Sequence, residues 1–246
     1  MNDELRLVED AQSFAERLTQ LVHGTVGPDC PPFVVTALEK SDVAYIRQSP
    51  ETGIPLRLVE DNWVTVSATY RCRLGSSGYL RVRSSKFAVT FGSERAGQPM
   101  FRYDYDAELK KRSPRAHLQI GDSGNLAALS SLAGDGSKTA RQRLGRVERG
   151  KAEFGPDDLH FPLGGERFRP ALEDILQFLI DQLGVTAEPG WREVVEAARV
   201  DWRGRQLWAA VTDDPEMAVA SLEHLGFRVE PPADVPPRRL EHLQAL

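Results

Sequence analysis

The sequence predicts an α+β fold with an N-terminal helix, a central antiparallel β-sheet meander backed by a helix, and a small C-terminal α/β module. An apolar pattern of helical period occupies the first 23 residues, and alternating apolar and polar residues dominate positions 33–120. A second helical pattern follows Pro170. With 246 residues, of which 41% are hydrophobic, the chain can bury one large core or two modest ones.

Residues 3–23 have the pattern of an amphipathic helix. Their apolar side chains recur at steps of three and four residues, which places them on one face. The next stretch, GTVGPDCPP at 24–32, is rich in Gly and Pro and ends the helix. The apolar face consists of Leu7, Ala11, Phe14, Leu18 and Leu21.

The region 33–120 has the pattern of short antiparallel strands. Within the run 63–74, residues 64–74 alternate between apolar and polar. A GSSG turn at 75–78 leads into a second alternating run, so we expect a hairpin with one apolar face. Further alternating segments extend it into a meander of four or five strands; they lie at 87–91, 101–105 and 116–120.

Residues 121–158 are rich first in Gly and Ser and then in Arg. This composition predicts a long loop that carries one short helix. A strong helix follows Pro170, because its apolar residues lie on one face, acidic residues occupy its first turn, and Gly184 is placed to end it. That face consists of Leu172, Ile175, Leu176, Leu179, Ile180 and Leu183.

The rest of the chain predicts a small α/β module with a Pro-rich tail, and we divide the chain into domains at 1–184 and 185–246. In the second part we expect helices at 191–200 and 215–225, and strands at 206–211 and 227–229.

The charge of the chain is unevenly distributed. The net charge of −5 argues against a uniformly basic nucleic-acid binder, yet residues 71–151 hold 17 Lys and Arg against 7 Asp and Glu. That segment carries +10 and the remainder −15. Arginine binds phosphates through planar, bidentate contacts, so the segment predicts a phosphate-binding surface. The candidate ligands are Arg71, Arg73, Arg81, Arg83, Arg102 and Arg115.

Three other interpretations of this basic segment stay open. Its charges can form an ordinary solvated sheet face, pair with the acidic remainder of the same chain, or bind an acidic partner protein. Charge alone does not choose among these interpretations.

Two histidines are candidates for acid–base chemistry. Metal-free cleavage of RNA needs a proton acceptor, a proton donor and cations that stabilise the charge developing on phosphorus. His117 alternates with apolar neighbours and shares the polar face with Arg115, and His160 follows the Arg-rich loop. Each can equally cap a strand or satisfy a hydrogen bond in the core. We take His117 and His160 as the catalytic pair if the protein is a nuclease.

Asp104 and Asp106 offer an alternative chemistry. Two carboxylates two residues apart on a strand can bind Mg²⁺ in a nuclease site. We favour a structural role, in which they end an edge strand and hydrogen-bond the turn that follows. No third acid lies at a spacing that completes a metal-nuclease pattern, and we expect no metal and no cofactor.

Four segments resemble, in their order along the chain, the TumE-like family of toxin–antitoxin proteins: KFAVTFG, PMFRYDYD, RAHLQIGD and LHFPLGGERFRPALEDILQFLI. Members of that family have a curved antiparallel sheet, with an Arg-Tyr-Asp strand followed by histidine-bearing strands. The resemblance covers at most residues 63–183 and implies a bacterial toxin-type domain that acts on RNA and has a cognate antitoxin. The chain departs from the pattern in having Gln119 after His117 and an inserted loop before His160.

The sequence thus favours a toxin-like RNA-binding domain, and it leaves open whether this domain is a metal-independent endoribonuclease. The alternative is a non-catalytic interaction protein of a multi-subunit bacterial system, docked through its basic face. We expect the partner to be RNA or an acidic protein. We expect no association with a membrane, since no stretch approaches 20 uninterrupted apolar residues. Two cysteines, too few for a disulfide framework, favour a reducing compartment and a cytoplasmic location.

Overall fold

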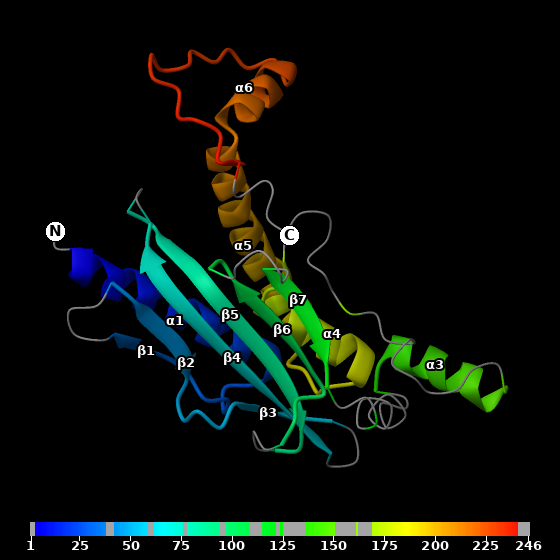
Figure 1. The fold of residues 1–246 in the computed structure, drawn as a ribbon. Coiled ribbons are helices and arrows are strands. Elements are labelled where there is room, and N and C mark those ends of the chain that lie inside the picture. The colour runs from blue at the N-terminus through cyan, green and yellow to red at the C-terminus, as the bar shows by residue number, and fades with distance from the viewer. Residues whose placement is uncertain are drawn as a thin grey trace.

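The computed structural model describes residues 3–37, 42–58, 62–75, 78–93, 97–108, 115–121, 124, 136–150, 161 and 169–240. It confirms the α+β class, with helices packed on one face of an antiparallel sheet (Figure 1). In this part of the chain, no helix has the length and apolar character needed to cross a bilayer.

The first helix, α1 (Asp3–Val26), lies along the back of the sheet (Figure 1). Its buried residues follow the predicted stripe and extend it by one turn, to Thr25. The Thr19 hydroxyl accepts a hydrogen bond from the Phe33 backbone N–H at 2.9 Å, which ties the helix to the first strand. The apolar period of the sequence therefore predicted this helix and its buried face correctly.

The sheet has seven strands in one antiparallel array, which is larger than the predicted meander of four or five. The strand order is β1-β2-β4-β5-β6-β7, and β3 pairs with the first half of β4. The strands are β1 (Phe33–Ala37), β2 (Ala44–Gln48), β3 (Ile54–Arg57), β4 (Trp63–Leu74), β5 (Leu80–Phe91), β6 (Phe101–Asp106) and β7 (Ala116–Ile120).

A β-bulge in β5 explains why the apolar residues of this strand switch from even-numbered to odd-numbered positions along its length. The register runs from Arg71 opposite Ser84 to Cys72 opposite Val82, so Arg83 is an extra residue on β5. Apolar residues therefore occupy even positions before the bulge and odd positions after it, yet all face the core. The core-facing residues of β5 are Leu80, Val82, Ser85, Phe87 and Val89.

Two further helices lie on the covered side of the sheet. The predicted helix after Pro170 is α4 (Leu172–Leu183), and Gly184 ends it in a left-handed conformation with φ of 71°. Nine residues of α4 are buried, among them Phe178, whose ring packs against Phe101 of β6. The short helix predicted within the Arg-rich loop is α3 (Lys138–Glu148), which packs on α4. The Ser137 hydroxyl caps it and donates to the Asp181 carbonyl.

The C-terminal part has helices where the sequence predicted both helices and strands. The strand predicted at 206–211 is wrong, because those residues belong to the long helix α5 (Trp191–Asp213), which continues through Gly204. The strand predicted at 227–229 is also wrong, since no strand forms there. The remaining helix is α6 (Pro215–His224). Val195, near the start of α5, joins the core formed by α1, α4 and the sheet. The division of the chain into two domains at residue 184 stays a prediction.

Candidate functional site

The face of the sheet opposite α1 and α4, here called the open face, carries polar residues in rows that cross the strands. Directly paired residues of neighbouring antiparallel strands point to the same side. One row contains Arg47, Thr69, Lys86, Asp104 and His117, one residue from each of β2, β4, β5, β6 and β7. The next row contains Tyr45, Arg71, Ser84 and Asp106.

These two rows surround a hollow of about 340 Å³ on the open face. Its polar lining contains two cations, two carboxylates and one imidazole, so its formal charge is balanced when the imidazole is neutral. The charged groups and the imidazole belong to Arg71, Lys86, Asp104, Asp106 and His117.

His117 lies beside Asp104 in this hollow. The His117 Nε2 is 3.8 Å from Asp104 Oδ2, and the two side chains are 23% and 21% exposed. Arg102 Nε lies 2.9 Å from the same carboxylate oxygen, without the alignment of a hydrogen bond. Asp104 therefore faces both a fixed cation and an imidazole, an arrangement that can hold a histidine ring in place for proton transfer.

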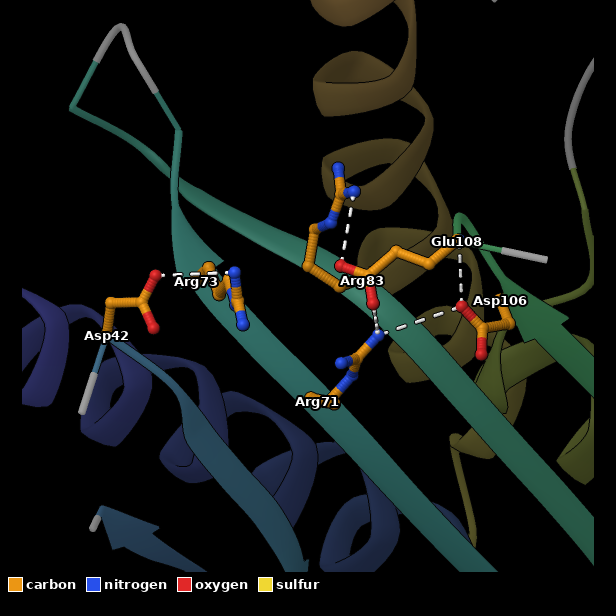
Figure 2. A network of polar contacts seen from close by, with 6 residues as sticks. All are labelled: Asp42, Arg71, Arg73, Arg83, Asp106 and Glu108. Carbon is orange, nitrogen blue, oxygen red and sulfur yellow. Dashed lines mark hydrogen bonds and ion pairs between the residues drawn. The ribbon is translucent and has the colours of Figure 1, made fainter. Parts of the chain in front are cut away.

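A cluster of charges adjoins the hollow and shares Arg71 and Asp106 with it (Figure 2). Arg71 donates to Glu108 Oε2 at 2.6 Å and lies 3.7 Å from Asp106 Oδ1, while Arg83 donates to Glu108 Oε1 at 3.4 Å. The hydrogen bond from Arg71 lowers the pKa of Glu108, and the same bond raises the pKa of Arg71. Glu108 therefore stays ionised near neutral pH and bridges the two guanidinium groups.

Four of the six predicted phosphate ligands already face a carboxylate. Besides Arg71, Arg83 and Arg102, Arg73 lies 3.3 Å from Asp42 (Figure 2). Of the interpretations left open by the sequence, internal pairing thus has direct geometric support. Phosphate binding by all six arginines stays a prediction, and a phosphate here would have to displace these carboxylates.

Asp106 has the structural role that the sequence favoured. It ends β6, and its Oδ1 accepts a hydrogen bond from the Glu108 backbone N–H at 2.8 Å. The expected edge position is wrong, because β6 lies between β5 and β7. Within the described ranges, no three His, Cys, Asp or Glu side chains lie close enough together to hold a metal ion.

The structure does not describe one part of the predicted site, and another part lies on the opposite side of the sheet. The second histidine, His160, lies outside the described residues, so its distance from His117 is not defined. The Arg-rich helix α3 packs on α4, which covers the opposite side of the sheet. The charge excess of residues 71–151 therefore does not form one continuous surface across the part of the chain that the structure describes.

The feature that the sequence interpretation missed is a helical extension, here called the arm, which comprises residues 200–240. The arm contains the second half of α5, α6 and the returning tail, and α6 lies at its far end, away from the sheet (Figure 1). Helix α6 has no buried residue, and Val195 is the single buried residue of α5. Large apolar side chains of the arm are exposed: Val200, Leu207, Trp208, Val211, Met217, Leu222, Leu225, Phe227, Val235 and Leu240.

The arm is an ordered element with its own polar contacts. The Asp214 side chain caps α6 by accepting from the Met217 N–H at 3.1 Å, and Pro215 occupies the first turn. The tail folds back, since Arg238 donates to Asp214 at 2.8 Å. At the base of the arm, the Trp208 ring meets the Tyr79 ring edge-on at 4.9 Å.

The helical nature of residues 206–211 leaves only a weak signal in the sequence. A short apolar run such as QLWAAV fits a strand or a helix, and Gly204 lowers the helix propensity just before it. The chain matches no protein-family model, no curated protein and no solved structure in the comparisons.

Proposed function

We propose that this chain is a non-catalytic interaction protein and that its partner docks on the arm. The observation that supports this proposal is the set of ten exposed large apolar residues along α5, α6 and the tail. Proteins rarely leave so many large apolar side chains exposed on one element unless another surface covers them.

The composition of the arm fits a protein partner. Trp and Tyr are enriched among residues that dominate binding energy, and the exposed Trp208 and Tyr79 lie together at the arm's base. Several of the arm's charges already pair within it, as Arg205 does with Asp201 and Arg239 with Asp213. The partner therefore offers a complementary apolar surface rather than an excess of charge.

The acidic partner that the sequence suggested for the basic face has less support. Arg71 and Arg83 share Glu108, and Arg73 faces Asp42, so much of that face is neutralised by its own carboxylates. The proposal retains a cytoplasmic location, which the two free cysteines, Cys30 and Cys72, favour.

A capture experiment in the native cells tests the proposal. The tagged wild-type chain is compared with the double variant Met217→Asp and Leu222→Asp, which places two charges on α6 without touching the core. The matched control is Leu5→Asp, because Leu5 is 59% exposed on α1, outside the arm. We expect one protein at stoichiometric amount with the wild type and the control, and its loss with the arm variant. Equal capture by all three chains would contradict the proposal.

The hollow on the open face favours a second function, a toxin-like metal-independent endoribonuclease. There His117 lies beside Asp104, while Lys86 and Arg71 supply cations. In this function His117 accepts the 2′-hydroxyl proton, the cations stabilise the charge on phosphorus, and His160 is the proposed proton donor. The arm would then bind a cognate antitoxin.

RNA binding and cleavage test this second function separately. The binding constant for a short fluorescent RNA should fall as the salt concentration rises. A plot of its logarithm against the logarithm of the salt concentration should have a slope of about −0.7 per phosphate contacted. Cleavage should be lost in His117→Ala and kept in His224→Ala, which removes a histidine of the arm. Binding that is independent of salt, or cleavage that survives His117→Ala, would exclude the endoribonuclease.

A further inference from the structure

A second concavity lies on the covered side of the sheet. It has a volume of about 450 Å³ and is lined by α1, β4, β5, the start of α4, and α5. Pockets of 300–1,000 Å³ are the usual size for small-molecule sites. We call it the cavity, and the sheet separates it from the hollow on the open face.

The walls of the cavity are mainly apolar and come from five separate elements. Phe14 and Leu18 of α1 face Leu80 and Val82 of β5, while α5 contributes the small side chain of Ala198. Small side chains on α5 leave space that larger ones would fill. A packed core seldom leaves an apolar space of this size without an occupant.

Two polar groups that line the cavity lack partners among the described residues. Glu173 of α4 lines the cavity at 5% exposure, and its Oε1 has no hydrogen-bond partner among the described residues. Trp202 of α5 also lines it, and the buried indole Nε1 is likewise without a partner there. Native proteins pair nearly all buried polar groups, because an unpaired one is costly.

The charges around the cavity disfavour an ionic ligand. An anion would meet Glu173, and a cation would meet Arg17 and Arg205, which line the cavity near Asp201. Burial raises the pKa of Glu173 to about 7, so its carboxyl group is protonated in part at neutral pH and can donate as well as accept. Trp202 can only donate.

We propose that the cavity binds a small uncharged amphiphile, with an aromatic or branched aliphatic body and one hydroxyl, amide or amine N–H group that reaches Glu173 and Trp202. The apolar body packs against the α1 and β5 side chains. The polar group exchanges hydrogen bonds with the carboxyl group of Glu173 and the indole N–H of Trp202. This site is distinct from the hollow, and its wall includes Trp202 and Arg205 from the first turns of the arm.

The test uses N-phenyl-naphthylamine, an uncharged fluorescent probe in which an N–H joins two aromatic groups. We expect saturable one-to-one binding to the full chain. Ala198→Phe should abolish binding by filling the cavity from α5, and Val82→Phe should do the same from β5. Ala210→Phe is the matched control, because Ala210 lies on α5, is exposed, and does not line the cavity.

A competition experiment tests the polar end. Benzylnaphthalene has a methylene group where the probe has its N–H, so it should bind roughly fivefold to tenfold more weakly than the probe. Glu173→Leu should remove that difference. Absence of probe binding, or binding unchanged in both cavity-filling variants, would overturn the site. Equal affinity for the two compounds in the wild type would overturn the assigned polar end.

Discussion

Helix α4 and the arm are both rich in large apolar residues, but their surroundings are opposite. Nine of the 12 residues of α4 are buried between the sheet and α5, whereas α6 buries none. Apolar composition therefore marks two different roles in one chain. In α4 it builds the core, and in the arm it forms a surface that another molecule can cover.

The difference arises from where each helix lies relative to the sheet. α4 runs against the covered side, where Phe178 meets Phe101 of β6. The second half of α5 extends past the sheet and carries α6 away from it (Figure 1). Trp208 has a ring contact with Tyr79 and still remains 50% exposed. The arm is thus held in position without being buried.

Truncation of a leucine in each region should show the largest contrast. Leu176→Ala in α4 should lower the free energy of unfolding by about 2–5 kcal/mol, because Leu176 is fully buried. Leu222→Ala in α6 should change it by less than about 0.5 kcal/mol, because Leu222 is 41% exposed. Urea denaturation measures both. Similar losses in the two variants would mean that the arm is part of the core.

Glutamates of the two regions should differ in their effect on stability with pH. Burial raises the pKa of Glu173 to about 7, from an ordinary 4.5. Between these values the folded state binds more protons than the unfolded state, so stability falls as pH rises, by roughly 3 kcal/mol at most. Glu173→Gln should remove this loss.

The matched substitution is Glu223→Gln, in the exposed helix α6. With this substitution, the unfolding free energy should depend on pH in the same way as in the wild type. The measurement is denaturation at a series of pH values from 4 to 8. A Glu173→Gln chain that follows the wild-type curve would show that Glu173 has its ordinary pKa.

Removal of the end of the arm should have the smallest effect on the fold. A chain that ends at residue 214 lacks α6 and the tail, neither of which contributes to the core cluster. Its unfolding free energy should stay within about 0.5 kcal/mol of the full chain. Thermal unfolding followed by circular dichroism measures this, and a lowered, less cooperative transition would contradict the comparison.

The sequence predicted the elements that have regular and complete apolar patterns. The stripe of α1, the stripe and Gly184 stop of α4, and the alternation of β4 each specify a buried face. The bulge at Arg83 was not predicted, although the apolar phase of β5 changes there. The arm was missed because a short apolar run beside Gly204, a residue of low helix propensity, fits a strand as well as a helix.

The candidate site was less predictable, because its contacts join distant parts of the chain. Alternation placed Arg71 and His117 on one face correctly. It could not show that Glu108, 37 residues from Arg71, binds that arginine, because the pairing depends on strand order. Nor could it show that α3 packs on the covered side, away from the other arginines.

Photo-crosslinking from the arm tests the central claim most directly. A photo-reactive amino acid replaces Met217 on α6 in one chain and Leu5 on α1 in another, since both positions are exposed, at 61% and 59%. After irradiation in the native cells, we predict one crosslinked protein of defined mass from position 217 and none from position 5. No crosslink from position 217, or the same products from both positions, would contradict a partner-binding arm.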